Sequence, residues 1–553
     1  MKNRYIELMD RTLTAYSYEH IVRYFDDVKK NGLTEHGFPR LTANIGILIA
    51  NGRRDNLLPI FTEMMDFCCE QIPRVKAAND FSVKEIVFCI MALEKRGLMP
   101  EKTEYWRSCL KTVEPIKCYN VYANKPTDVR HNWACFTAVS EFMRQYIGLC
   151  DSAEFIDIQI PTQLVNFEEN GMYRDPNNPM VYDLVPRGLF AVMMSFGYNG
   201  KYAPEIDALL KKSGLLTLYM QSVTGEIPYG GRSSGFPHNE AHFAVVMEYE
   251  AKRYAKEGDF KLAGAIKAAI SLALDSIELW LSAEPIRHIK NRFPTETKYG
   301  CEDYAYFDKY MITTASFLYA AYLVCDDGIE TGVLDEAPRA FNLSEHFHKT
   351  FLKAGGYFAE IDTKADPHYD CSGLGRVHKK GAPSTVCLST PCAAHPLYKL
   401  DIEAPGDVSL AAGYVKDGIT VFATGENAVY EVLSIGSDNE SASALIKTAF
   451  ADGTEQTATY RVSAEGVEIS VTGAMENALM LPAFVFDGEK YTDISLDGSA
   501  LTVSYGGYVC KYETNGAITD LKLLGGNRNG HCKAYAVKKK GELKVRIVIT
   551  EVR

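Results

Sequence analysis

The sequence predicts a fold in two parts, a ring of paired helices followed by an antiparallel β-sandwich. Through roughly the first 330 residues, apolar residues recur at the three- and four-residue spacing of amphipathic helices. Beyond about residue 335, short alternating runs appear, with turn-forming residues about every ten positions. Helices and strands kept in separate halves of a chain form separate layers, not a parallel α/β sheet. We therefore expect an (α/α) toroid over residues 1–335 and an antiparallel β-sandwich over residues 336–553.

The helical half reads as about a dozen amphipathic segments joined by loops. The clearest segments span 55–70, 83–96, 133–149, 206–222, 239–256, 260–281 and 311–324. The long loops between helices are rich in glycine, proline, asparagine and aromatic residues, and they span 118–132, 166–182, 223–238 and 284–308. Long loops in a compact domain are usually functional, so we expect them to line a cleft at one end of the toroid.

The second half contains short apolar–polar runs of the kind that form half-buried strands. They span 408–412, 419–422, 458–462, 469–471, 501–505 and 545–549. Turn formers recur between the runs, at Asp452-Gly453, Asp487-Gly488, Asp497-Gly498 and Gly525-Gly526-Asn527. This rhythm predicts a sandwich of antiparallel strands.

Composition limits the function classes. The chain has 553 residues, of which 46% are hydrophobic and 24% charged, as in ordinary globular proteins of two or three domains. The net charge of −12 argues against nucleic-acid binding, which needs a basic surface. An anionic sugar remains compatible with it, because a cleft can differ in sign from the whole protein.

The cellular compartment is predicted from three sequence features that are absent: a signal peptide, a membrane-spanning run and paired cysteines. Residues 1–10 lack the apolar stretch and cleavage site of a signal peptide, and no run of about 18 uncharged apolar residues would cross a membrane. The 14 cysteines are scattered, many in apolar stretches, and show no CxxC spacing. We expect a cytoplasmic protein with reduced thiols and no membrane partner.

No cofactor is predicted. The sequence has neither a GxGxxG motif after a strand nor a GxxxxGK[ST] motif, so a dinucleotide or a nucleoside triphosphate is not supported. His238 and His242 resemble a zinc-binding helix, but HExxH requires a glutamate directly after the first histidine. Glu240 comes one position late, which rotates it by about 100° on a helix. We therefore expect no metal.

Segment 225–240 holds the densest group of chemically active side chains. Arg232 can form a bidentate hydrogen-bonded pair with a carboxylate, and Tyr229 and His238 can both transfer protons. The helix expected to begin near His238 would favour an anion at its N-terminus. The alternative is a rigid connection between two helices.

Two further polar segments lie near expected element boundaries. In 128–133, Asn132 can donate to a carboxylate and His131 can exchange a proton, or Asn132 simply caps the following helix. In 366–381, His378 lies among basic residues and glycines. That segment suits a loop reaching the toroid cleft, and equally an exposed basic hairpin.

Two loops interleave aromatic and charged residues, a combination that suits sugars, whose C–H faces stack on rings. Amphipathic tyrosines that pack the loops explain the pattern equally well. The candidate substrate-binding residues of these loops are Tyr173, Arg174, Tyr299, Glu302 and Tyr304.

A toroid with Asn, His, Tyr and Arg in its loops, followed by a sandwich with a His-bearing loop, resembles the heparinase II/III-like polysaccharide lyases. Intracellular exo-acting oligo-alginate lyases belong to the same structural group. The resemblance covers the whole chain in architecture, and Asn132, Tyr229, His238 and His378 match by residue type and context. The same architecture also resembles glycoside hydrolases that remove uronic acids, and a shared fold does not settle the reaction.

The lyase resemblance implies β-elimination. This reaction removes the C5 proton of a uronic acid and expels the 4-linked oxygen, so the carboxylate must be neutralised. Asn132 and Arg232 would neutralise it, and Tyr229, His238 and His131 would transfer protons without a metal. The expected partner is an anionic oligosaccharide, and a homo-oligomer is left open.

Two alternatives remain. Hydrolysis of a terminal uronide requires two carboxyl groups, which Glu240 and Asp175 could supply. The second alternative is a non-catalytic glycan-binding protein, although binding alone does not require so many titratable side chains in the loops.

Overall fold

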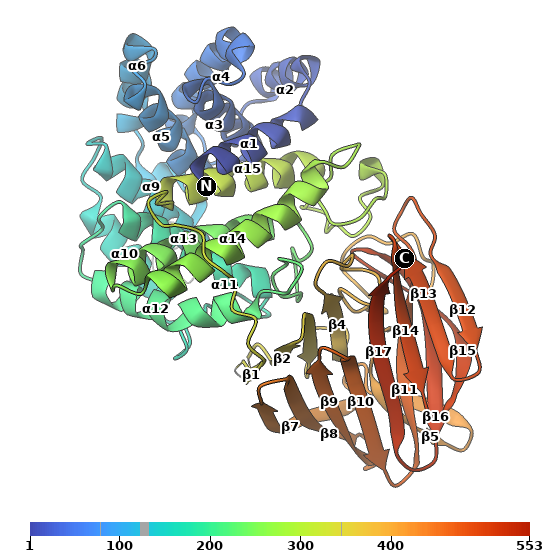
Figure 1. Cartoon of the computed structure of the whole chain (residues 1–553). Coiled ribbons are helices and arrows are strands. Elements are labelled where there is room, and N and C mark those ends of the chain that lie inside the picture. The colour runs from blue at the N-terminus through green and yellow to red at the C-terminus, as the bar shows by residue number, and fades with distance from the viewer. Residues whose placement is uncertain (78, 122–131, 344–345, 553) are drawn as a thin grey trace.

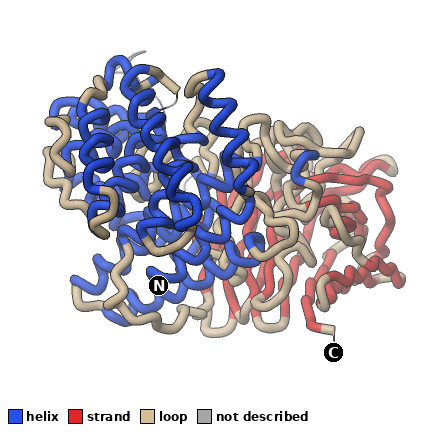
Figure 2. The backbone as a smooth tube through the Cα atoms, turned by 90° about the horizontal axis from the view of Figure 1, so that it is seen from above, coloured by secondary structure: helices blue, strands red, loops and turns tan. Residues whose placement is uncertain are grey.

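The computed structural model describes residues 1–77, 79–121, 132–343 and 346–552. Helices precede strands along the chain: the last helix, α15 (Phe307–Val324), and the first strand, β1 (Arg339–Asn342), are joined by a segment with neither. The two parts lie side by side (Figure 1), and the view from above shows helices and strands on separate sides of the molecule (Figure 2). The predicted order of a helical domain followed by antiparallel sheets is confirmed.

Six described helices form a closed inner ring, in which each helix packs against the next and α15 packs against α3. They are α3 (Gly37–Ala50), α5 (Asn79–Lys95), α9 (Trp133–Tyr146), α11 (Met180–Ser195), α13 (His238–Lys256) and α15. These helices are buried over most of their length, because apolar residues lie inside the ring and other helices cover it outside.

The outer helices pack mainly on single members of this ring. They are α1 (Lys2–Thr12), α2 (Tyr18–Asn31), α4 (Leu58–Gln71), α6 (Pro100–Lys111), α10 (Ala153–Leu164), α12 (Ala203–Met220) and α14 (Phe260–Leu281), with the short α7 (Pro115–Cys118) between α6 and α9. Single 3₁₀ turns lie at Leu13–Ala15, Asp55–Leu57, Ile72–Arg74 and Thr295–Thr297.

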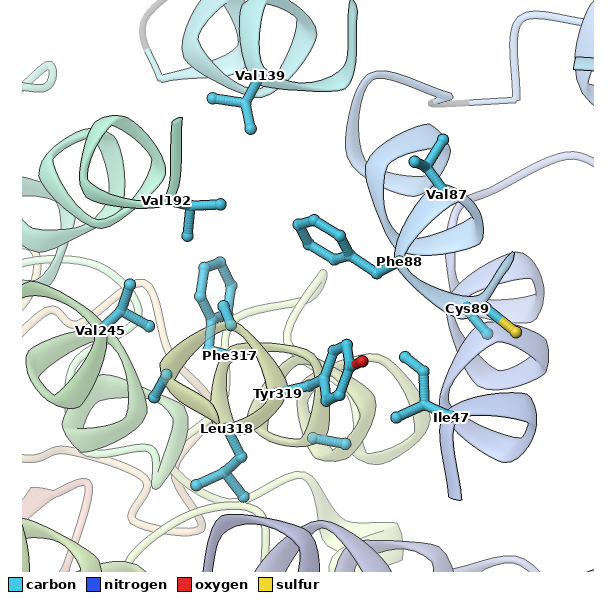
Figure 3. Packing of buried hydrophobic residues seen from close by; sticks show 14 of the residues in the cluster. Ile47, Val87, Phe88, Cys89, Val139, Val192, Val245, Phe317, Leu318 and Tyr319 are labelled. Atoms are coloured by element: carbon cyan, nitrogen blue, oxygen red, sulfur yellow. The ribbon is translucent and has the colours of Figure 1, made fainter. Parts of the chain in front are cut away.

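The centre of the ring is filled by apolar side chains. Figure 3 shows Val139, Val192 and Val245 directed inward from α9, α11 and α13, with the rings of Phe88 and Phe317 between them. Each of these side chains is at most 3% exposed. Burying one such side chain contributes about 1.5–3 kcal/mol, so the ring is a packed core and not a channel.

The β domain has one long layer facing two shorter sheets. Within the described residues, the long layer has the strand order β12-β13-β14-β17-β10-β9-β8-β7. The facing sheets have the orders β1-β2-β3-β4 and β15-β16-β11-β5-β6, and strands of both contact the long layer. All these strand pairs are antiparallel. A core of alternating inward-facing residues lies between the layers.

After β1, the strands of the smaller sheet are β2 (Lys349–Ala354), β3 (Tyr357–Asp362) and β4 (Gly373–Lys379). The remaining strands are β5 (Ala412–Lys416), β6 (Ile419–Phe422), β7 (Ala428–Ser437), β8 (Ser441–Phe450), β9 (Glu455–Ser463), β10 (Gly466–Gly473), β11 (Glu476–Phe486), β12 (Asp493–Asp497), β13 (Ala500–Tyr505), β14 (Tyr508–Thr514), β15 (Ala517–Asn527), β16 (Gly530–Lys539) and β17 (Leu543–Glu551).

Two local expectations in this half were wrong. The run 408–412 is not a strand: β5 begins only at Ala412, and Val408 and Leu410 make isolated bridges. The pair Gly525-Gly526 lies inside β15, so the turn to β16 falls after it. These glycines are needed for close packing, because a Cβ at Gly525 would approach Val408 to 2.7 Å.

All 14 cysteines are free thiols, and most are buried. Among the described residues, no helix combines the length and the apolar character that a membrane crossing requires.

Candidate functional site

A cavity of about 440 Å³ opens at one end of the toroid; we call it the toroid cavity. Its lining comes from the N-terminal turns of all six inner helices and from the loops preceding α13 and α15. Helix N-termini carry a partial positive charge and unpaired N–H groups, which favour an anion. Phe136 and Phe317 belong to the lining and to the apolar core, so the cavity is closed toward the centre of the ring.

The cavity lining holds three basic side chains, Arg40, Arg232 and Lys309. Among the described residues that line it, Glu35 is the one carboxylate. Glu35 accepts a hydrogen bond from the Gly37 N–H at 2.7 Å and lies 3.6 Å from the Lys309 ammonium. The lining is thus predominantly basic, although the whole chain is acidic.

Arg40 is the cation best placed to receive a ligand. It is 3% exposed, and its Nε donates to Glu85 at 3.0 Å. Lys84 donates to the same carboxylate at 2.8 Å, so two cations share one anion and the group keeps a net positive charge. Burial opposes ionisation, but Arg40 and Lys84 outweigh it and lower the pKa of Glu85 to about 2. The Arg40 Nη2 is buried without a hydrogen-bond partner among the described residues.

His238 and His242 lie one turn apart on α13, and both line the cavity. Burial, and then the charge of Arg40, lowers the pKa of His238 to about 3. Burial and the neighbouring His238 lower the pKa of His242 well below its usual value. Both imidazoles are therefore neutral near pH 7. The Nδ1 atoms of both are buried without a described hydrogen-bond partner, so each ring retains a nitrogen that can accept or donate a proton.

Three tyrosine hydroxyls meet at one serine beside these histidines. The Ser233 hydroxyl lies 2.7 Å from the Tyr310 hydroxyl and 3.2 Å from those of Tyr182 and Tyr304. Burial raises the pKa of all three tyrosines above the usual value of about 10. The phenols therefore keep their protons at neutral pH and can donate them. The rings of Tyr310 and His238 are 4.7 Å apart between centroids.

The sequence-predicted pair Asn132 and Arg232 lies on the same cavity wall, joined by Asp175. The Asn132 side chain donates to Asp175 at 3.2 Å, and the Arg232 guanidinium forms an ion pair with Asp175 and lies over the Tyr182 ring. Asn132 and Arg232 therefore share an anion before any ligand arrives. The predicted His131 lies outside the described residues.

Of the other predicted residues, Tyr304 lines the cavity, whereas Tyr229, His378 and Glu302 lie at the contact between the two domains. Tyr229 is fully buried, with the Lys349 ammonium 3.2 Å from its ring centroid. His378 bonds to the Ser222 hydroxyl at 2.7 Å and to Ser389 at 3.0 Å. The alternative of an exposed basic hairpin around His378 is wrong, because β4 is buried.

The two carboxylates proposed for a hydrolase are not among the described residues that line the cavity. Asp175 is held by Asn132 and Arg232, and Glu240 is fully buried in an ion pair with Lys290 at 2.7 Å. Each already has a cationic partner.

Three predicted substrate contacts also lie away from the cavity lining. The Tyr173 hydroxyl donates to Gln163 at 2.7 Å, and Arg174 contacts the His346 ring. Tyr299 stacks on Phe293 and donates to the Gly530 carbonyl at 3.0 Å. These contacts match the alternative in which aromatic residues pack the loops.

Sequence reasoning did not select several lining residues, namely Glu35, His36, Arg40, Lys309 and Tyr310. Only Arg40 has a clear local signal: it is the one charged residue in the otherwise apolar segment Gly37–Ala50. A lone charge on such a helix is rarely buried without a specific partner or function.

No family model and no curated protein matches this chain. Several solved structures are similar to it. The heparan sulfate lyase from Pedobacter heparinus has 8% identity and a TM-score of 0.36, covering 89% of this chain and 75% of its own. A mutant of chondroitin AC lyase from Streptomyces coelicolor A3 has 10% identity and a TM-score of 0.46, covering 99% and 79%. A family 88 glycosyl hydrolase from Bacteroides vulgatus has 12% identity and a TM-score of 0.38, covering 59% and 99%.

Proposed function

We propose that this protein is an oligosaccharide lyase that cleaves uronic-acid-containing chains by β-elimination in the toroid cavity. One observation carries the proposal: the cavity lining combines three cations, neutral histidines and protonated tyrosines with a single described carboxylate. Elimination requires neutralisation of the uronate, a base and an acid. Hydrolysis by the usual route requires two carboxyl groups that flank the bond.

Arg40 is the proposed uronate-binding group. Its unpartnered Nη2 and the net charge of the Arg40–Lys84–Glu85 group are available to an anion, whereas Arg232 is already paired with Asp175. Neutralising the carboxylate withdraws charge from the carbanion that forms at C5, which lowers the barrier to proton removal. Asn132 and the helix N-termini would add hydrogen-bond donors around the cavity.

His238 is the proposed base. It is neutral in the empty cavity, and an arriving uronate places a negative charge beside it, which raises its pKa toward the working range of a proton acceptor. The phenols of Tyr304 and Tyr310 would return a proton to the leaving oxygen. Because Tyr310 and His238 have adjacent rings, base and acid can reach the same sugar residue. The assignment of Tyr229 as proton carrier stays a prediction, and the cavity geometry favours the tyrosines that meet at Ser233.

The test uses a panel of 4-linked uronate oligosaccharides, monitored by the ultraviolet absorbance of a C4–C5 unsaturated uronate. We expect the absorbance to rise for at least one uronate chain. The matched control is the same oligosaccharide with its carboxyl groups reduced to alcohols, which should not be cleaved, because the acidity of the C5 proton depends on the carboxylate. Cleavage of both chains is compared by the release of new reducing ends, since products of the reduced chain would lack the conjugated carboxylate. Cleavage of both at similar rates would contradict the proposal.

A further inference from the structure

We propose that the β-sandwich completes this site: Arg528 is a positioning residue that, through Glu302 and Ser233, holds the three tyrosine hydroxyls in place. This inference rests on the proposed function, since it assigns the hydroxyls to the reaction. It gives the sandwich domain a part in the chemistry, although the cavity is lined by residues of the toroid half.

Arg528 reaches from the turn between β15 and β16 to the toroid loops. Its Nη2 donates to Glu302 Oε1 at 2.6 Å and its Nη1 donates to Glu302 Oε2 at 3.0 Å. Nη1 also donates to the Gly300 carbonyl at 2.7 Å. The guanidinium is 1% exposed, so this bidentate pair is shielded from water and has one fixed geometry.

Glu302, held by Arg528, in turn fixes the loop before α13. Its Oε1 accepts a hydrogen bond from the Ser233 backbone N–H at 2.7 Å. Glu302 is 3% exposed, and its side chain therefore joins the loop before α15, the loop before α13 and the sandwich. The sequence pointed to Glu302 as a substrate contact, but both of its oxygens are occupied by protein donors.

Ser233 has a backbone φ of +58°, in the left-handed region that residues other than glycine seldom adopt. The bond from its N–H to Glu302 stabilises this conformation, as does the bond from the Asn239 side chain to its carbonyl at 3.1 Å. In this conformation the Ser233 hydroxyl is the common partner of the hydroxyls of Tyr182, Tyr304 and Tyr310. The positions of three phenolic protons therefore depend on one backbone conformation.

The consequence is a specific kinetic effect. Weakening the Arg528–Glu302 fork would let Ser233 relax and shift the tyrosine hydroxyls, and a displacement of about 1 Å costs about 10²-fold in rate. Uronate binding through Arg40 would change little, because Arg40 lies on α3 with partners on α3, α5 and α15. We expect kcat to fall while KM stays nearly constant.

The experiment compares Arg528→Lys with Arg292→Lys. Lysine keeps the charge but cannot form the two parallel bonds to Glu302. Arg292 is the matched control, since it also joins a toroid loop to the sandwich, through Asp487 at 3.5 Å, and is not part of the cavity lining. Arg528→Lys should lower kcat about 10- to 100-fold with KM within about twofold, and Arg292→Lys should leave both unchanged.

A second measurement does not depend on turnover. In protein labelled at the phenolic carbon of tyrosine, Tyr304→Phe and Tyr310→Phe identify the resonances of those two residues by NMR. Arg528→Lys should shift both resonances, and Arg292→Lys should shift neither. Shifted resonances in a protein that cleaves no uronate would refute the proposed function while supporting the positioning role. Unshifted resonances together with wild-type kcat in Arg528→Lys would overturn the inference.

If Arg528→Lys does not fold, Ser233→Gly tests the same link from its other end. Glycine adopts a positive φ without strain, which offsets part of the cost of losing the buried hydroxyl, so the variant should fold with a modestly lower unfolding temperature at most. It lacks the hydroxyl, so kcat should still fall about 10-fold or more, with the Tyr304 and Tyr310 resonances displaced. Wild-type kcat with undisplaced resonances in Ser233→Gly would also overturn the inference.

Discussion

The toroid cavity and the contact between the two domains are both rich in buried charge, but their charges are partnered differently. At the domain contact, oppositely charged side chains follow one another in what we call the interface ion chain, with successive groups 2.7 to 4.0 Å apart. Its members, in order, are Glu240, Lys290, Glu226, Arg376, Glu360, Lys349 and Asp362. Buried atoms without a hydrogen-bond partner occur in both places, but every member of the interface ion chain has an opposite charge within 4.0 Å. In the cavity, His238 and His242 have no charged partner among the described residues, and Arg40 shares its one carboxylate, Glu85, with Lys84.

This difference in charge pairing distinguishes groups that stabilise the fold from groups that are available to a ligand. A buried charge beside an opposite charge is neutralised within the fold, and removing one member leaves the other unpaired. A cavity group that has no opposite charge beside it, or shares one with a second cation, can gain such a partner from an anionic ligand. We therefore interpret the interface ion chain as holding the domains together and the cavity groups as the reactive site.

The largest effect on turnover is expected for His238→Asn. Asparagine retains a polar atom near the position of Nδ1 but cannot accept a proton as a base. Loss of a positioned base costs about 10² to 10⁴-fold, so kcat should fall by that factor with a small change in KM. Steady-state kinetics on a cleaved uronate chain measures this effect. A variant with wild-type kcat would remove His238 from the chemistry.

The opposite pattern is expected at the interface ion chain. Lys290→Met leaves Glu240 and Glu226 without their shared cation, and breaking a buried pair in this way costs about 3–5 kcal/mol in the free energy of unfolding. The kcat per folded molecule should stay near that of the wild type, because Lys290 is not part of the cavity lining. Urea unfolding of a sample tests the expected loss of stability, and turnover of the same sample tests the expected kcat. An unchanged unfolding free energy would contradict the structural role of the interface ion chain.

Arg40→Met should affect binding more than stability. Glu85 keeps Lys84 as its cation after the change, so no buried carboxylate is left unpaired. A hydrogen bond to a charged group contributes about 1.5–3 kcal/mol, which corresponds to a roughly 10- to 150-fold rise in KM for a uronate substrate. Calorimetric titration with a uronate disaccharide should show the same loss in affinity. Equal affinity in the two proteins would place the carboxylate elsewhere.

The smallest effect is a change in the pH dependence of stability. His238 has a folded pKa of about 3, below its ordinary unfolded value of about 6.5, so the unfolded state binds an additional proton between these values. The neutral, buried His238 contributes this stability fully above about pH 6.5, and it is lost as the pH falls toward 3. His238→Asn should flatten the slope of unfolding free energy against pH by up to about 1.4 kcal/mol per unit in this window. An unaltered slope would mean that His238 does not resist protonation.

The sequence predicted the fold order and selected some of the residues that line the candidate cavity, because both are encoded locally. Arg232, Asn132, His238 and Tyr304 line the cavity, and all four lie at the start of an inner helix, directly before one, or in the loop leading to it. Tyr229 comes from the same loop as Arg232 but is buried against Lys349 of the sandwich. No local pattern reveals which side of a loop will face a domain that lies more than a hundred residues later in the chain.

Arg40 and Glu302 show the remaining limits of local patterns. Arg40 lies in an apolar helix, and its partner Glu85 comes from the next helix of the ring, 45 residues later. Glu302 lies among aromatic residues that suit a sugar, yet Arg528, 226 residues away, binds its carboxylate. Both roles depend on contacts between distant segments, which periodicity and motif spacing do not report.

The most direct measurement of the central claim is a mass balance on one cleaved uronate oligosaccharide. Elimination divides the substrate without consuming water, so the masses of the two product fragments should add up to the mass of the substrate. Hydrolysis would add one water to that sum. We expect fragments that sum to the substrate, one of them carrying a C4–C5 double bond, and no such products from His238→Asn. Fragments that sum to the substrate plus one water would contradict the assignment of the toroid cavity as a lyase site.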